Sequence, residues 1–177
     1  MTLGVRWLPE FDWEMSQTRR CLERVPDDRF DWKPHLKCMS LGRLATFLAM
    51  LPSWFRITLA QDSLDLTVGP QDALPPRVSR ETVLDQFDRN AAAGREALAR
   101  VSDERLQMPW TLRSASRELF TRPRHAVLRG AVLNHLIHHR AQLALYLRLL
   151  ELPVPAIYGP SADEPEMDRW LGPGGHS

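Results

Sequence analysis

The amino-acid sequence predicts an all-α protein, a four-helix bundle with a long crossover between its second and third helices. Four segments carry apolar residues at helical spacing, and clusters of Pro, Gly and Asp separate them. The chain of 177 residues is 44% hydrophobic and 25% charged, a composition typical of one soluble globular domain. We expect that domain to cover residues 1–165 and residues 166–177 to form a flexible tail.

The first helix is expected from about Pro9 to Arg24, because proline suits a first helical turn and Pro26 with two aspartates ends the pattern. The second is expected to begin after Ser40, a favourable N-cap, and to kink at Pro52. Their core-facing stripes are Phe11, Met15, Thr18, Leu22 and Val25, and then Leu44, Phe47, Leu48, Leu51 and Phe55.

Residues 61–78 have turn residues and no sustained period, so we expect a long connection there. Ser79 can cap a third helix that stops near Ser102. Residues 103–123 contain scattered prolines and polar residues that could form a short turn or hairpin but no long element, and we expect this segment to be irregular. The fourth helix is expected from about Arg124 to Leu150, and the prolines of segment 152–155 end it.

The net charge and the N-terminal sequence limit the classes of partner that we expect. The formal net charge is +1, which leaves no overall field to hold a nucleic acid or an anionic membrane surface. The arginine-rich stretch 113–129 is interpreted as a solvated loop. The N-terminus lacks a signal-peptide pattern, and no apolar run approaches the ~18 residues of a membrane span. Two cysteines without metal or disulfide spacing favour the reducing cytoplasm.

The fourth helix has two apolar sides. At 100° per residue, one face should look into the bundle; it carries Leu128, Ala131, Val132, His135, His139, Gln142, Leu143 and Tyr146. The opposite side is more apolar than a solvent-facing helix should be; it carries Leu133, Ile137, Ala141, Ala144 and Leu145. We therefore predict that a partner subunit covers the second side and that the protein is a homodimer.

His135 and His139 are four residues apart, so on a helix both imidazoles point to one face. Two neutral imidazoles are half of a metal site, which normally needs a third protein ligand. A structural interpretation stays open, in which both rings bond to Gln142, Tyr146 or the backbone. His125 lies roughly 15 Å away along the helix and cannot join the same ion.

Several further segments carry a resemblance to a known family. They are Pro9–Pro26, Phe30–His35, Ser40–Thr46, Asn134–Leu143, Tyr146–Arg148 and Pro153–Ser161. In their order and spacing the sequence resembles the DinB and YfiT-like superfamily of helical-bundle proteins. The resemblance implies a bundle, commonly dimeric, whose metal is held by one His of helix 2 and a His-x-x-x-His pair of helix 4. It also implies, for some relatives, transferase or isomerase activity with a low-molecular-weight thiol.

The match to that pattern is partial. His135 and His139 correspond to the helix 4 pair, whereas Phe47 stands where relatives have the helix 2 histidine. A phenyl ring offers no lone pair to a divalent ion such as Zn, Ni or Fe. Glu14, His35 or a water could supply a third ligand instead, with Gln142 and Tyr146 supporting the histidines.

Two functions follow from these residues. One is a metal-dependent, thiol-using transferase or isomerase acting on a small electrophile, with the metal as Lewis acid. The other is a metal-free, non-enzymatic bundle that binds a small ligand or serves as a dimeric interaction module. The sequence leaves the choice between enzyme and binding protein open.

Overall fold

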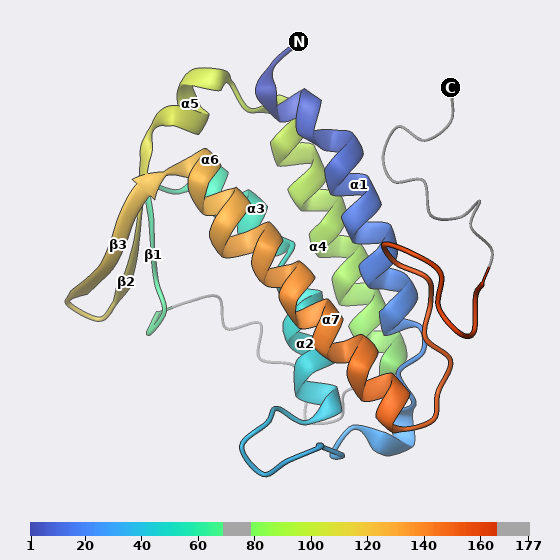
Figure 1. Cartoon of the computed structure of the whole chain (residues 1–177). Coiled ribbons are helices and arrows are strands. Elements are labelled where there is room, and N and C mark those ends of the chain that lie inside the picture. The colour runs from blue at the N-terminus through green and yellow to red at the C-terminus, as the bar shows by residue number, and fades with distance from the viewer. Residues whose placement is uncertain (69–78, 166–177) are drawn as a thin grey trace.

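The computed structural model describes residues 1–68 and 79–165, and within them the protein is mostly helical (Figure 1). The long helices are α1 (Leu3–Leu22), α2 (Leu41–Met50), α3 (Ser53–Ala60), α4 (Arg80–Arg100) and α7 (Asn134–Leu149). Shorter helical elements are η1 (Asp27–Arg29), α5 (Asp103–Gln107), α6 (Arg124–Val127) and the π-helical turn η2 (Leu128–Leu133). The strands are β1 (Ser63–Asp65), β2 (Pro109–Ser114) and β3 (Arg117–Pro123). No helix among the described residues combines the length and apolar character that a membrane crossing requires.

The helices pack around one main core. Helix α1 contacts α4 and α7, and α2 contacts the same two helices (Figure 1). The expected core stripes are buried at Phe11, Leu22, Leu48, Phe87 and Leu98. The close approach of α4 to the break between α2 and α3 depends on Gly94, because a Cβ there would lie 2.8 Å from the Pro52 carbonyl oxygen.

The first helix begins earlier than predicted. It starts at Leu3, where the Thr2 side chain accepts a hydrogen bond from the Val5 amide, so Pro9 lies inside the helix. Proline removes the hydrogen bond of its own missing N–H and crowds the carbonyl four residues earlier, but α1 continues through Pro9. The N-cap upstream therefore decides where the helix begins, and the prediction from Pro9 is wrong.

The second and third predicted helices are confirmed in their main features. Ser40 caps α2 by accepting a hydrogen bond from the Arg43 amide, and the helix breaks at Pro52 before α3. Ser79 caps α4 in the same way through the Thr82 amide. The caps place these helices because each satisfies an amide that the first helical turn leaves without a partner.

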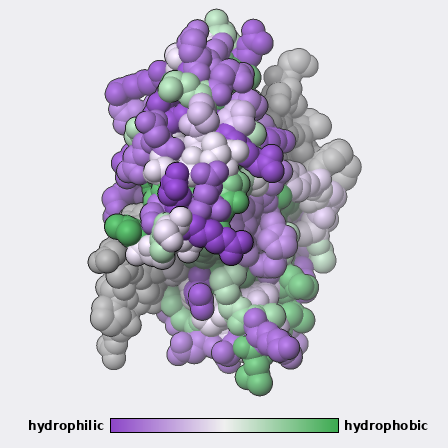
Figure 2. Space-filling model, turned by 90° about the vertical axis from the view of Figure 1, so that its left-hand side faces the viewer, coloured by the Kyte–Doolittle hydropathy of each residue, from purple (hydrophilic) through white to green (hydrophobic). Residues whose placement is uncertain are grey.

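The protein is mostly helical, as the all-α prediction has it, but a small sheet is also present and segment 103–123 is not irregular. This segment forms α5 and a hairpin of β2 and β3, and β1 adds in parallel to β2, giving the strand order β1-β2-β3. Trp110 and Leu112 point inward to a second, smaller core, which also contains Ile57, Leu64 and Val127. The sheet turns a mainly hydrophilic side outward, as the upper part of Figure 2 shows.

Arg124 joins the sheet to the helices. Its guanidinium is fully buried and donates to the backbone carbonyls of Thr58, Gln61 and Pro109 and to the Asp62 carboxylate. Burial is possible because these acceptors satisfy the guanidinium N–H groups. The interpretation of stretch 113–129 as a solvated loop is therefore wrong, since this arginine holds the hairpin in place.

The last helical stretch begins at Arg124 as predicted and continues through η2 into α7. On its second apolar side, Leu133 is buried and Ile137 packs against the main core of the same chain. Ala141 remains exposed, and 58% of Leu145 is exposed. The chain itself covers part of that side, and the homodimer stays a prediction. The expected tail, residues 166–177, lies outside the described residues.

Candidate functional site

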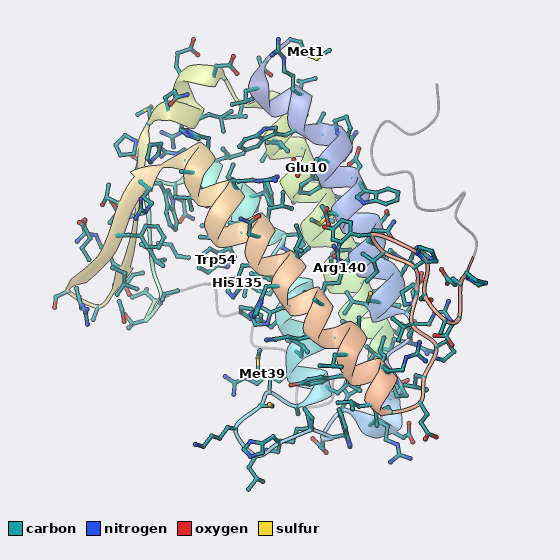
Figure 3. The ribbon with its side chains drawn as sticks, viewed as in Figure 1. Met1, Glu10, Met39, Trp54, His135 and Arg140 are labelled. Atoms are coloured by element: carbon teal, nitrogen blue, oxygen red, sulfur yellow. The ribbon has the colours of Figure 1, made fainter. Side chains whose placement is uncertain are left out.

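Helix α7 carries polar side chains on two different sides (Figure 3). His135 lies on the side toward Trp54 and the sheet, and Arg140 lies on the side toward α1. The side that carries His135 adjoins a cleft. The candidate site is therefore built from the histidine side of α7.

His135 and His139 contact each other directly. Their Nε2 atoms are 2.8 Å apart, and His139 Nδ1 lies 2.8 Å from Gln142 Oε1. The amide of Gln142 lies 3.0 Å from His138 Nε2. With the amide in this orientation, His139 donates to Gln142 and Gln142 donates to His138, and the Nε2 atoms of His135 and His139 lie at hydrogen-bond distance. The arrangement links three imidazoles through one amide, all on the same helix.

The histidine pair is uncharged at neutral pH. Burial lowers the pKa of His135 below 6.5, and the neighbouring His139 lowers it further. Burial also lowers the pKa of His139, against the opposing effect of its hydrogen bond to Gln142. Both rings are thus neutral, which is the form that accepts a proton, a hydrogen bond or a metal ion.

Phe47 of α2 packs its ring against both imidazoles. The ring centroids are 5.3 Å apart for His135 and 4.9 Å for His139, both in edge-to-face geometry. Such contacts stabilise aromatic pairs by about 0.5–1.5 kcal/mol beyond the area that they bury. At the position where the family pattern has a metal ligand, both histidines therefore contact an apolar ring.

The donor set does not fit a resident metal. Zn–N bonds of about 2.0–2.1 Å at angles of 90–109° need Nε2 atoms about 2.9–3.4 Å apart, so the spacing of His135 and His139 comes close. What the described residues lack is a third ligand. The residues that the structure describes contain no group of three His, Cys, Asp or Glu side chains able to hold one ion. Two imidazoles and a phenyl ring make an incomplete coordination shell.

The two side chains considered as a third ligand, Glu14 and His35, form hydrogen bonds away from the histidine pair. The Glu14 carboxylate accepts from Arg140 Nη1 at 2.7 Å and from the Tyr158 hydroxyl at 2.6 Å, on the other side of α7. His35 is exposed in the loop before α2, and its Nδ1 accepts from the Lys37 amide. The structure does not bring either side chain to the histidine pair.

Of the two expected supporting residues, only Gln142 contacts a histidine of the pair. The Tyr146 hydroxyl donates to the Met39 carbonyl, and its ring packs edge-on against Trp32. Burial and a hydrogen bond with Cys38 raise the pKa of Tyr146 to about 12. Tyr146 therefore anchors the loop before α2.

A cleft of about 630 Å³ opens beside the histidines, between the sheet, the α2–α3 region and the η2–α7 helix. Its apolar lining is Phe47, Leu51, Trp54, Leu66, Leu112 and Ala131. Its polar lining is Asn134, His135 and His138, and Gly130 completes the wall. Sequence reasoning missed the contributions of Leu66 and Leu112, because they depend on the unpredicted sheet.

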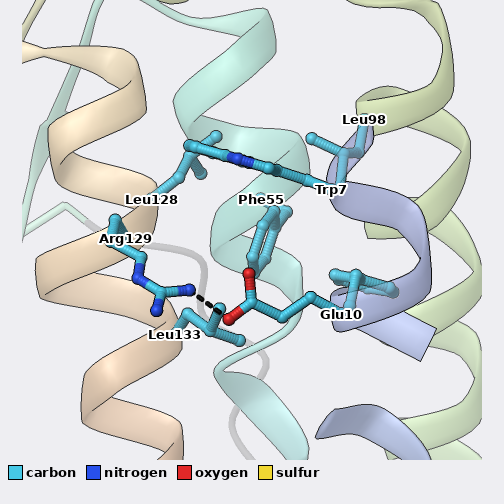
Figure 4. A pocket seen from close by; sticks show the side chains of 8 residues that line it. Trp7, Glu10, Phe55, Leu98, Leu128, Arg129 and Leu133 are labelled. Carbon is cyan, nitrogen blue, oxygen red and sulfur yellow. Dashed lines mark hydrogen bonds and ion pairs between the residues drawn. The ribbon is translucent and has the colours of Figure 1, made fainter. Parts of the chain in front are cut away.

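A second cavity is too small for more than about one water molecule. It has a volume of about 10 Å³, between Trp7, Phe55, Leu98 and Leu128, and an ion pair of Glu10 with Arg129 lies at its edge (Figure 4). The larger cleft is thus the candidate site.

Comparisons with known proteins agree with this fold. The model of the DinB family matches residues 2–171. A DinB-like protein, YjoA, from Bacillus subtilis is 16% identical with a TM-score of 0.66, over 92% of this chain and 99% of its own. A DinB-like protein from Bacillus cereus is 23% identical with a TM-score of 0.67, over 86% of this chain and 95% of its own.

A third solved structure, from Exiguobacterium sibiricum and described as a member of the DinB family, is 23% identical with a TM-score of 0.62. It covers 85% of this chain and 94% of its own. No curated protein matched the sequence. At these identities the solved structures show the fold.

Proposed function

The chain belongs to the DinB family, and from this premise we propose that it binds a small, mainly apolar molecule in the cleft beside α7. The observation that carries the proposal is an apolar cleft whose wall contains His135, one member of a hydrogen-bonded histidine pair. In this proposal His135 offers the ligand a polar contact, and His139 and Gln142 hold that ring in place.

The cleft has the dimensions and composition of a ligand site. Its volume lies within the roughly 300–1,000 Å³ that is usual for small-molecule pockets. Most of its lining is apolar or aromatic, and its few polar groups gather at the α7 wall. Apolar surface supplies affinity in such pockets, and a small number of polar groups fixes the orientation of the ligand.

The metal-dependent alternative has weaker support. The family resemblance implies a metal and a small thiol, but Phe47 removes one ligand, and the described residues offer no third His, Cys, Asp or Glu side chain to the pair. Low-molecular-weight thiols usually carry ionised groups, and none of the described residues that line the cleft is Asp, Glu, Lys or Arg. The donor set and the uncharged wall therefore favour the binding protein.

Titration with N-phenyl-1-naphthylamine, an uncharged fluorophore that brightens in apolar sites, tests the proposal. We expect saturable binding at one site and about tenfold weaker binding by Trp54→Ala, because an aromatic wall of the cleft is lost. Trp13→Ala removes a tryptophan of α1 that does not line the cleft and serves as the matched control. Absence of saturable binding, or equal losses in both variants, would overturn the proposal.

Metal analysis of protein purified without an affinity tag separates the two functions. After incubation with Zn²⁺, Ni²⁺ or Fe²⁺, we expect well under one ion per chain, because two imidazoles alone hold an ion weakly. One ion per chain, lost in His135→Ala, would favour the metal-dependent alternative.

A further inference from the structure

Gly130 leaves an opening in the wall of the cleft. A Cβ built on this residue meets no atom within 4 Å, whereas a Cβ at Gly4, Gly42 or Gly94 would lie 2.4–2.9 Å from a neighbouring atom. Its φ is not in the left-handed region, so the backbone does not require glycine either. Packing and backbone geometry leave this glycine unexplained. Its remaining effect is the open space that it gives the cleft.

The turn that contains Gly130 is π-helical. In η2 each hydrogen bond spans five residues, so successive side chains are separated by a smaller angle than in an α-helix. Gly130 and Ala131, which are consecutive and small, both line the cleft as a result. Turns of this kind occur frequently at functional sites. At these two positions the wall therefore carries no side chain larger than a methyl group.

None of the described residues that line the cleft is Asp, Glu, Lys or Arg. Its polar members are Asn134, His135 and His138. An ionised ligand would lose its hydration here without gaining a counter-charge, which is costly in an apolar site. An uncharged ligand avoids that cost and can still form a hydrogen bond with the amide or an imidazole.

We propose that the cleft selects uncharged aromatic molecules and that Gly130 sets the size of the ring system that it admits. This inference rests on the proposed function and names the ligand class of the same site. The aromatic rings of Phe47 and Trp54 give a flat ligand matching surfaces, and the space at Gly130 accommodates its breadth. Asn134 and His135 recognise a hydrogen-bonding group on the ring.

Two probes that differ in one group test the charge selection without any variant. N-Phenyl-1-naphthylamine is uncharged, and 8-anilinonaphthalene-1-sulfonate has the same ring system with an added sulfonate. We expect the uncharged probe to bind at least about tenfold more tightly, because the sulfonate finds no cation in the wall. Equal affinities, or tighter binding of the sulfonate, would overturn the charge selection.

Two substitutions at one position test the size selection. Gly130→Leu should weaken binding of N-phenyl-1-naphthylamine about tenfold by filling the cleft, whereas Gly130→Ala should change it by less than about threefold. Both variants should fold, since the added Cβ meets no neighbour, and circular dichroism and thermal unfolding check this. Unchanged affinity in a folded Gly130→Leu variant would overturn the role of Gly130.

The outcomes distinguish failure of the proposed function from failure of the inferred ligand class. If the unmodified protein binds neither probe, the proposed function itself fails. If both probes bind equally, Gly130→Leu has no effect and Trp54→Ala weakens binding, the cleft is a ligand site and the inference about its ligand class fails.

Discussion

His139 and Arg140 are neighbours in sequence, and yet their side chains belong to two different kinds of polar cluster. Arg140 is 1% exposed and pairs with Glu14 of α1 at 2.7 Å, while its guanidinium lies 5.1 Å from the ring centre of Tyr158. His139 bonds to His135 and Gln142 of its own helix. The arginine cluster joins α1, α7 and the C-terminal segment, whereas the hydrogen bonds of the histidine cluster stay within α7.

This difference indicates which cluster serves the fold and which serves a ligand. Charges that are buried and paired across elements fix the positions of those elements, because separating them leaves a charge without a partner. Neutral imidazoles that bond within one helix fix no neighbouring element. Beside a cleft they retain the capacity to bond to a ligand. We therefore assign a structural role to Glu14 and Arg140 and propose a binding role for His135.

The largest expected effect is the loss of stability when Arg140 is replaced. Arg140→Met leaves the Glu14 carboxylate buried with only Tyr158 as a partner, and breaking such a pair costs about 3–5 kcal/mol of unfolding free energy. Urea denaturation measures this loss. Affinity for N-phenyl-1-naphthylamine, measured on the fraction that remains folded, should not change.

The double variant Glu14→Gln with Arg140→Met provides the control. It removes both charges, so it should be more stable than Arg140→Met alone. A loss below about 1 kcal/mol for Arg140→Met, as in an exposed ion pair, would contradict the structural role.

The second-largest expected effect is a gain of zinc affinity when Phe47 is replaced by histidine. Phe47→His should place a third imidazole against the pair, since the Phe47 ring already contacts both histidines. We expect the affinity for Zn²⁺ to rise on the order of a hundredfold, at least as much as loss of a supporting residue lowers it in other metal sites. Isothermal titration calorimetry with ZnCl₂ measures the change.

Two variants control for this substitution. Phe47→Ala opens the same space without adding a ligand and should gain no affinity. Phe47→His combined with His139→Ala should lose the gain. If Phe47→His binds Zn²⁺ no better than the unmodified protein, residue 47 does not correspond to the family's helix 2 ligand.

The sequence predicted the helical part of this fold because caps and breakers act locally. Ser40, Pro52 and Ser79 each fix a helix boundary through contacts within a few residues. The strands were missed because only Trp110 and Leu112 alternate inward on β2, and β1 has a single buried residue, Leu64. Such short patterns become recognisable only when the strands pair.

The candidate site was predictable to a similar extent. The His135–His139 pair and its Gln142 partner follow from helical spacing alone. The cleft does not, because Leu66 and Leu112 reach it through the sheet. Nor does the burial of Arg124, a residue type that is usually exposed, since its carbonyl partners come from two segments far from it in sequence, the end of α3 and the start of β2.

The smallest expected effect is a pH dependence from the histidine pair. Burial lowers the pKa of His135 and His139 in the folded protein below the 6.5 of an exposed imidazole. Between the folded and unfolded pKa values the unfolded chain binds more protons, so unfolding free energy falls as the pH drops below about 6.5. Above pH 7.5 both states are neutral and the effect vanishes. Urea denaturation at several pH values measures how unfolding free energy changes with pH. The double variant His135→Ala with His139→Ala should lose the part of this change that occurs below about pH 6.5.

An identical pH dependence in the unmodified protein and the double variant would show that the pair is not neutral and buried as the structure has it. The distinction between the two sides of α7 would then fail as well.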